Sequence, residues 1–205
     1  MSHFDRCPSA MSLYTERGER KYLCANERAA FYAALEVLVD PKDRTFCEII
    51  YWTGCRPSEA LALSALNIDL AERVVVIRSL KKRGELKGRH FRPVPVPEEF
   101  IARMVRVHDL RAVQAGGDGN DRLWRFSRTT AWKRMKLVME AAGLTGERAC
   151  AKGLRHAYGV HAAMAHVPET RIKKWLGHAS LATTGIYLDM AAPEDRRMAE
   201  KMWAA

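Results

Sequence analysis

The chain has 205 residues, of which 48% are hydrophobic and 28% are charged, and these proportions exclude a disordered chain and favour a globular domain. The formal net charge of +10 indicates a polyanionic partner, with nucleic acid first and an anionic membrane surface second. No apolar run approaches the roughly 20 residues of a membrane-spanning helix, and the start MSHFDRCPSA lacks the apolar core of a signal peptide. We therefore expect a cytoplasmic protein without a membrane partner.

The first part of the chain predicts three helices after a polar segment. Residues 1–21 show no clear period, so we expect a flexible lead-in or a short arm. The first helix is predicted to start with Asn26 as its N-cap, because apolar residues recur at helical spacing from there. A second helix carries Pro41 in its first turn and ends at Gly54, and a short third helix begins at Pro57.

The pattern then changes to that of β-strands. Residues 73–80 are rich in β-branched side chains, and residues 91–97 form a shorter strand candidate whose prolines suggest the edge of a sheet. The connection between them, KKRGELKGRH, is basic and contains glycine. Together these segments predict a β-hairpin with a strongly positive tip.

Helical patterns return after the hairpin. One helix is predicted over residues 97–113, and another follows Ser127, a good N-cap residue. From Lys152 to the end of the chain, the pattern predicts helices in short pieces. The predicted fold class is mostly α with a small antiparallel β-sheet, that is, α+β.

The stretch TGCRPSEAL, residues 53–61, suggests a site for an anion. It places Arg56 after the glycine that ends one helix and at the start of the next. A guanidinium beside the free N–H groups of a helix N-terminus suits phosphate. Glu59, three residues on, can brace Arg56. The same two residues can equally form a surface ion pair of little energetic weight, so this stretch alone leaves both interpretations open.

Two later stretches are similarly ambiguous. KGLRH gathers Lys152 and Arg155 at a helix start, where they suit either phosphate or solvent. Further on, Gly177 ends a helix and Ser180 is predicted to cap the next one, which carries Tyr187. Two short helices around a glycine turn are also typical of a helix-turn-helix DNA reader, in which this tyrosine would be structural.

The order of the motifs decides between these interpretations, because together they resemble the tyrosine recombinase (phage integrase) family. The chain has TGCRPSE, LKGRHFRPVPVP, KGLRH and LGHASLATTGIY. The family has T-G-x-R-x-S-E, a β-hairpin lysine, H-x-L-R-H and L-G-H-x-x-x-x-T-T-x-x-Y. The resemblance covers about residues 22–205 and implies the catalytic-domain fold of that family.

The resemblance implies roles for five residues. Arg56 and Arg155 would clamp the scissile phosphate, His178 would add a hydrogen bond, and Tyr187 would be the nucleophile. Lys152 stands where the family has a histidine that assists proton transfer. A lysine there still donates hydrogen bonds to phosphate but is a poorer general base unless neighbouring cations lower its pKa.

The hairpin lysine of the family protonates the departing 5′-oxygen. Lys87 aligns best with it, and Lys81 or Lys82 would serve if the loop carries an insertion. The remaining cations expected to contact DNA are Arg83 and Arg89 in the tip and Lys173 and Lys174 before Gly177.

The implied activity is that of a site-specific recombinase or integrase, which cleaves and rejoins DNA through a covalent 3′-phosphotyrosine. Two arginines can replace a metal ion in stabilising the transition-state charge, so we expect no metal, no ATP and no other cofactor. The alternatives are a non-catalytic DNA-binding relative, such as a regulator or accessory factor, and a type IB topoisomerase-like enzyme.

The resemblance also implies double-stranded DNA and further copies of the chain as partners. In the family, a tetramer forms on paired sites, and the terminal helix docks into a neighbouring subunit. Met198, Met202 and Trp203 form a short apolar stripe that suits this docking, or packing on its own domain. The motifs start so early that we expect no separate N-terminal core-binding domain, in a catalytic-domain-only recombinase or in a fragment of a longer one.

Overall fold

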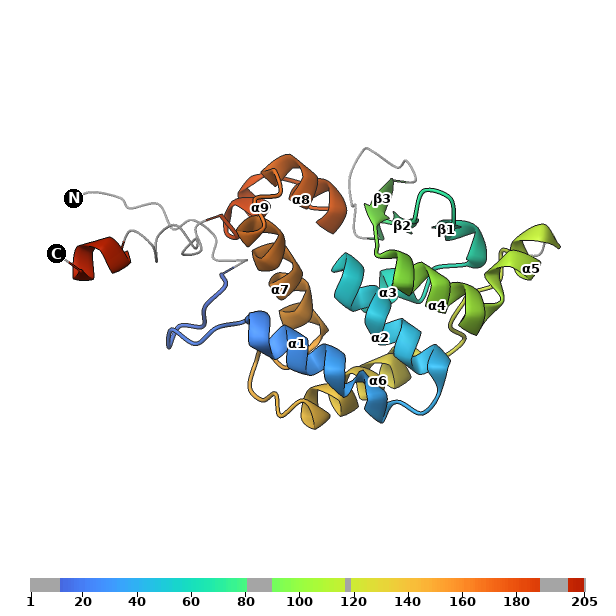
Figure 1. The fold of residues 1–205 in the computed structure, drawn as a ribbon, viewed down its shortest axis with the longest axis horizontal. Helices are drawn as coiled ribbons and strands as arrows, with labels where there is room; N and C mark the ends of the chain where they lie inside the picture. Colours follow the sequence, from blue (N-terminus) through green and yellow to red (C-terminus); the bar gives the residue numbers. More distant parts are fainter. Residues whose placement is uncertain (1–11, 81–89, 117–118, 189–198, 205) are drawn as a thin grey trace, which may run out of the picture.

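The structure, a computed structural model, describes residues 12–80, 90–116, 119–188 and 199–204. Within these ranges it is mostly helical with one small antiparallel sheet (Figure 1), so the predicted fold class is confirmed. The α-helices are α1 (Ala25–Ala33), α2 (Pro41–Thr53), α3 (Pro57–Ala60), α4 (Glu98–His108), α5 (Leu110–Ala115), α6 (Arg128–Ala141), α7 (Ala151–Met164), α8 (Glu169–Leu176) and α9 (Ala182–Gly185). The 3-10 helices are η1 (Ala34–Val37) and η2 (Ala65–Asn67), and the strands are β1 (Ile68–Asp69), β2 (Val74–Arg78) and β3 (Phe91–Pro95).

The predicted hairpin strands are confirmed as β2 and β3, which pair antiparallel in a sheet of order β1-β2-β3. Strand alternation points Val94 and Arg92 of β3 toward the interior and leaves the two prolines of this edge strand on the outside. Arg92 pairs in register with Ile77 of β2. The sheet therefore carries one arginine on its inner face.

Helix α2 is the centre of the helical core, and eight of its thirteen residues are buried. It packs against α7 on one side and against α4 and α6 on the others. Asp40 caps its start by accepting the N–H of Lys42, and Gly54 ends it in the left-handed conformation with φ +61°. The predicted start and end of this helix are thus confirmed, and the end places Arg56 at the beginning of α3.

Two predicted helix boundaries are wrong. The first helix starts earlier than Asn26, because Cys24 is its N-cap and the Glu27 carboxylate accepts the Cys24 N–H at 2.8 Å. The helix predicted over residues 97–113 is two helices, α4 and α5, since Asp109 between them adopts φ +48°.

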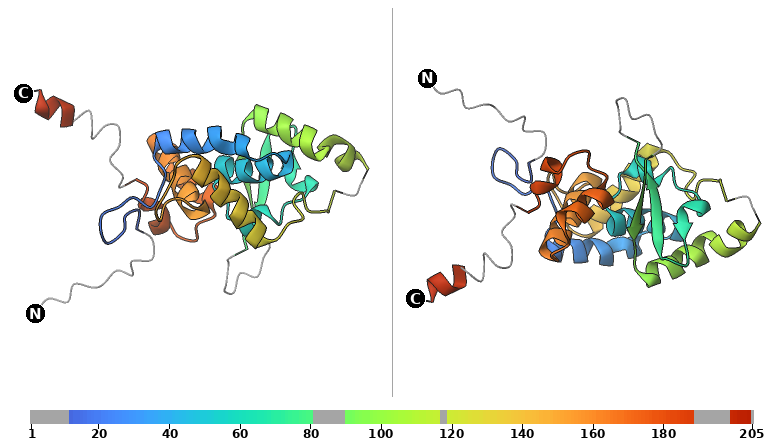
Figure 2. Two further views of the ribbon diagram at one scale, coloured as in Figure 1. Left: turned by 90° about the horizontal axis from the view of Figure 1, so that it is seen from below. Right: turned by 90° about the horizontal axis from the view of Figure 1, so that it is seen from above.

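The two ends of the described chain differ in their packing. Near the start, Tyr14 pairs with Arg20 in an isolated β-bridge, and Leu13 and Leu23 are buried in the core. At the other end, residues 199–203 form a short helix away from the rest of the domain (Figure 2). None of the helices in the described ranges has the length and apolar character that a membrane crossing requires.

Candidate active site

Arg56 is held in place by Glu59, which lies one turn later on α3. The Arg56 backbone N–H donates to Glu59 Oε2 and its Nη1 donates to Glu59 Oε1, both at 3.0 Å. The Glu59 side chain is fully buried, whereas 26% of the Arg56 side chain is exposed. Burial alone would raise the pKa of Glu59, but Arg92 and Arg56 hold it below its usual value. The Glu59 carboxylate is therefore ionised, and it orients the Arg56 guanidinium, which is partly exposed.

Arg155 is buried on α7 and connects the ends of two other helices. Its Nη1 donates to the carbonyl of Gly54 at 2.7 Å, and its Nη2 donates to the carbonyl of Leu176 at 2.6 Å. Burial, with a contribution from the charge of Arg56, lowers the pKa of Arg155 to about 10. The group remains protonated at neutral pH, so the structure keeps a buried positive charge at this point.

His178 directly follows Gly177, which ends α8 with φ +67°. Its Nδ1 lies 3.0 Å from the Thr184 hydroxyl, and its Nε2 is buried without a hydrogen-bond partner among the described residues. Burial and the charges of Arg155 and Arg56 lower the pKa of His178 to about 3, so the ring is neutral at pH 7. If the Thr184 hydroxyl donates to Nδ1, the ring proton sits on Nε2, which can then donate to an anion.

Tyr187 lies in a turn just after α9, and only 1% of it is exposed. Its hydroxyl is 3.1 Å from His156 Nδ1, and its ring stacks on His178 with centroids 6.0 Å apart. Burial raises the pKa of Tyr187 to about 12, although Arg155 and Arg56 act in the opposite direction. The two arginines favour the phenolate, but in this conformation the cost of desolvation is larger.

The predicted cap of the last helix is also wrong. Leu181 is the N-cap of α9, and Ser180 instead contacts the Thr183 hydroxyl at 3.0 Å. The tyrosine follows this helix and is not carried on it. Its backbone N–H donates to the carbonyl of Thr184 at 3.0 Å, which fixes the turn next to His178.

Four predicted residues interact electrostatically in the structure: the charges of Arg56 and Arg155 act on the pKa values of both His178 and Tyr187. Lys152 is exposed in the first turn of α7, and its charge helps to lower the pKa of His156. Two further candidates lie on the last turn of α8, where Lys173 is half-buried and Lys174 is exposed. Lys81, Lys82, Arg83, Lys87 and Arg89 lie outside the described residues.

The sequence interpretation assigned no role to two residues that the structure places here, Arg92 and His156. Both are buried, with 4% and 2% exposed. An available signal for Arg92 was its spacing of two from Val94, which places both on the inner face of β3, where an arginine requires polar partners. His156 was visible in KGLRH, but nothing in the sequence connects it to Tyr187, 31 positions later.

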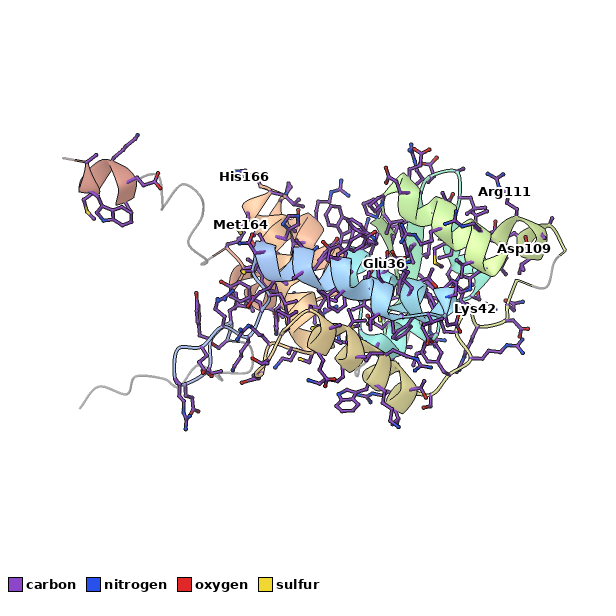
Figure 3. All side chains as sticks on the ribbon, turned by 60° about the horizontal axis from the view of Figure 1, so that its bottom comes forward. Glu36, Lys42, Asp109, Arg111, Met164 and His166 are labelled. Atoms are coloured by element: carbon purple, nitrogen blue, oxygen red, sulfur yellow. The ribbon has the colours of Figure 1, made fainter. Side chains whose placement is uncertain are left out.

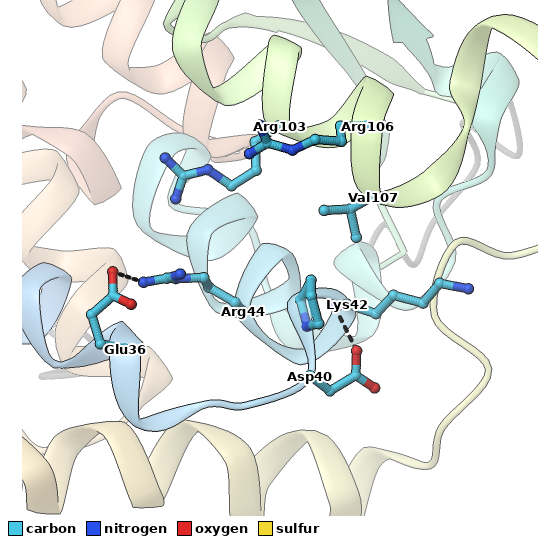
Figure 4. Close-up of a pocket in the computed structure, with 8 residues that line it drawn as sticks. Glu36, Asp40, Lys42, Arg44, Arg103, Arg106 and Val107 are labelled. Carbon is cyan, nitrogen blue, oxygen red and sulfur yellow. Dashed lines mark hydrogen bonds and ion pairs between the residues drawn. The ribbon is translucent and has the colours of Figure 1, made fainter.

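One hollow lies near Lys42 and another near Met164, two residues labelled in Figure 3, and neither is lined by these site residues. The first, of about 660 Å³, is formed mainly by the start of α2 and by α4. In this hollow Glu36 forms an ion pair with Arg44 (Figure 4), so part of the positive charge of the lining is neutralised. The second, of about 400 Å³, lies between α7 and the first part of α1 with the segment before it. In the described part of the chain, no three His, Cys, Asp or Glu residues are grouped as metal ligands would be.

The fold and the ordered motifs are those of an integrase catalytic domain. The model of the Phage integrase family matches residues 21–194, and the chain therefore belongs to this family of tyrosine recombinases. The tyrosine recombinase XerD of Pseudomonas aeruginosa is 32% identical over 182 residues, which cover 83% of this chain and 58% of that protein. XerD of Haemophilus influenzae is 30% identical over 176 residues, covering 82% of this chain and 56% of the relative. The chain thus spans less than two thirds of the length of these relatives.

Solved structures show the same fold. The crystal structure of XerA recombinase superposes with a TM-score of 0.68 at 25% identity, covering 90% of this chain and 65% of that one. XerH in a post-cleavage complex with a palindromic difH substrate gives a TM-score of 0.73 at 21% identity, covering 96% of this chain and 58% of XerH. The catalytic domain of bacteriophage HP1 integrase gives 0.61 at 19% identity, over 88% of this chain and 93% of that domain.

Proposed function

We propose that the chain is the catalytic domain of a site-specific DNA recombinase or integrase, which cleaves and rejoins DNA through a 3′-phosphotyrosine at Tyr187. The observation that carries this proposal is that the Tyr187 ring stacks on His178 and that the charges of Arg56 and Arg155 act on both groups. Residues 22–205 would form this domain. Membership of the tyrosine recombinase family supports the reaction class.

The proposed chemistry follows from what each group can donate. Arg56 and Arg155 stabilise the negative charge that develops on the non-bridging oxygens, which in many phosphoryl-transfer proteins is the task of a metal ion. His178 adds a hydrogen bond from Nε2, the buried nitrogen that has no partner among the described residues. Lys152 adds a further positive charge at the start of α7.

The covalent step is balanced without a co-reactant. The Tyr187 oxygen bonds to phosphorus as the bond from phosphorus to the 5′-oxygen breaks, and the phenol proton passes to solvent water. A hairpin lysine, Lys87 or else Lys81 or Lys82, protonates the 5′-oxygen. Attack by a 5′-hydroxyl on the phosphotyrosine reverses the step and rejoins the strands.

Cleavage in this scheme requires Tyr187 to leave the position described above. A phenol that is 1% exposed, with a pKa of about 12, is shielded from DNA and is protonated. The position therefore corresponds to a resting state, and DNA binding would supply the free energy for exposing the ring.

We further propose double-stranded DNA and other copies of this chain as partners. The net charge of +10 and the XerH complexes with difH substrates support DNA as the ligand. Oligomerisation through the terminal helix is supported by Met202 and Trp203, which are 70% and 66% exposed. Apolar groups this exposed are typical of a protein interface.

The test is covalent trapping on a suicide substrate. Nicked duplexes that tile the DNA around the gene are incubated with the chain, and denaturing gels detect a protein–DNA adduct. The wild type should form the adduct in the presence of EDTA, and Tyr187→Phe should not. Tyr158→Phe is the matched control, because Tyr158 lies on α7 outside the proposed machinery, and it should form the adduct normally.

Other outcomes favour the alternatives. Retention of DNA by the wild type without any adduct would favour a non-catalytic DNA-binding relative. Adduct formation with relaxation of supercoils and no recombinant product would favour a topoisomerase-like activity. Strict dependence on Mg²⁺ would contradict the proposed arginine clamp.

A further inference from the structure

We propose that Arg92 is a positioning residue for cleavage, which orients Arg56 and the turn that bears His178. The inference rests on the proposed function. Arg92 lies on the inward face of β3 and is 4% exposed. Three segments that are distant in sequence meet on this one side chain, and two of them lead directly to proposed catalytic groups.

The first connection runs from Arg92 through Glu59 to Arg56. Arg92 Nη2 donates to Glu59 Oε2 at 2.6 Å, and Arg92 Nη1 lies 3.5 Å from Glu59 Oε1. The same two oxygens accept the backbone N–H and Nη1 of Arg56. Arg92 and Arg56 thus share the Glu59 carboxylate. By fixing the plane of this carboxylate, Arg92 also fixes the direction of the Arg56 guanidinium.

The second connection runs to the end of α8. Arg92 Nε donates to the carbonyl of Trp175 at 2.8 Å, and the next carbonyl, that of Leu176, accepts from Arg155. Gly177 lies directly against Arg92, since a Cβ added there would be 3.1 Å from the guanidinium carbon. The left-handed turn that presents His178 therefore rests on the Arg92 side chain.

The third connection joins Arg92 to the other strand of the hairpin. Its Nη1 donates to the Ser79 hydroxyl at 2.8 Å. Each of the three guanidinium nitrogens thus donates to a protein acceptor, and the side chain is almost completely buried. A phosphate could reach it only by displacing these partners, so Arg92 acts on the reaction through its neighbours.

The test compares Arg92→Lys with the same substitution in a second arginine–glutamate pair whose carboxylate is buried. Lysine keeps the charge but loses the planar fork that holds Glu59 and Trp175 together. Arg103→Lys is the control, because Arg103 Nη1 donates at 2.5 Å to Glu48, whose side chain is also fully buried, away from the site. Rapid-quench kinetics on the suicide substrate at saturating DNA separates the rate constant from the amplitude of adduct formation.

We expect Arg92→Lys to slow the rate constant by about 10- to 100-fold, because small displacements of positioned groups are costly. The amplitude and the DNA affinity should stay near those of the wild type. Arg103→Lys should change the rate constant less than about twofold, as expected for a site outside the catalytic network. A variant that merely lost folded protein would instead lower the amplitude at an unchanged rate constant.

A double-mutant cycle with Arg56→Lys tests the proposed connection. If Arg92 acts through Arg56, the double variant should be little slower than Arg56→Lys alone, whereas independent effects would multiply. An Arg92→Lys rate constant equal to that of the wild type would overturn the inference, and so would multiplicative effects in both this cycle and a parallel cycle with His178→Gln. Should Arg92→Lys fail to fold, Ser79→Ala makes the same comparison by removing one acceptor, with a severalfold slowing expected. Failure of the wild type to form any adduct would count against the proposed function itself.

Discussion

Replacing Gly159 with alanine should disturb the packing of the Tyr187 ring against α7. Gly159 lies inside α7, and a Cβ built there would be 2.6 Å from Cε2 and Cζ of the tyrosine ring. Real Cβ atoms do not approach so closely, so either the ring or the helix must move. Because Tyr187 is 1% exposed, a shift of the ring exposes apolar surface or strains its neighbours.

The magnitude follows from two opposing effects. Alanine is favoured over glycine in a helix interior by about 1 kcal/mol. Overpacking of a buried position costs about 1–3 kcal/mol. The net change in the wild-type background should therefore be a destabilisation of between about 0 and 2 kcal/mol. In a Tyr187→Ala background the obstacle is gone, and the same substitution should stabilise the protein by about 1 kcal/mol.

Urea unfolding of the four proteins in this cycle measures the reversal of sign. Tyr158→Ala supplies the control background, since the Tyr158 ring contacts Gly54 and the ring against Gly159 is that of Tyr187. In that background Gly159→Ala should keep its wild-type effect. An equal effect of Gly159→Ala with and without Tyr187 would refute the position of the tyrosine ring.

Three further predictions concern glycine geometry, pH and salt. Gly54 and Gly143 both have positive φ, but an added Cβ would lie 2.8 Å from Tyr158 at Gly54 and would meet nothing within 4 Å at Gly143. Gly54→Ala should therefore destabilise the protein by at least about 2 kcal/mol, because a clash adds to the backbone strain. Gly143→Ala should cost about 1 kcal/mol from strain alone. Burial lowers the pKa of His156 to about 4 and that of His178 to about 3, so the unfolded chain binds protons first as pH falls below about 6.5. The free energy of unfolding should therefore decrease as the pH falls from about 6.5 to 4, by roughly 1 kcal/mol per pH unit for each histidine. His178→Gln should make this dependence of stability on pH less steep. An unchanged dependence on pH would contradict a buried neutral His178 ring. DNA affinity should fall steeply between about 50 and 200 mM salt, as phosphate contacts require, and a flat salt dependence would argue against a basic DNA-binding face.

Local signals in the sequence were sufficient for part of the site. Gly54 and Pro57 mark a helix end and a helix start, and these alone place Arg56 correctly. Gly177 likewise predicts the turn before His178. Such features depend on backbone preferences of neighbouring residues, which is why they could be predicted without knowledge of the tertiary fold.

The remaining features depend on contacts between distant segments. Tyr187 is buried against α7, where its hydroxyl contacts His156, 31 positions away, and no periodicity encodes that contact. The role of Arg92 depends on partners in α3 and α8. The start of α9 was misplaced because Ser180 resembles a capping residue, whereas its hydroxyl contacts Thr183. Tertiary packing decides each of these cases.

The most direct test of the central claim is to identify the residue that becomes linked to DNA. The adduct formed on the suicide substrate is digested with nuclease and protease, and mass spectrometry locates the remaining nucleotide. The account predicts a 3′-phosphonucleotide on Tyr187 in the wild type and no adduct in Tyr187→Phe. A nucleotide on any other residue, or an adduct that persists in Tyr187→Phe, would contradict it.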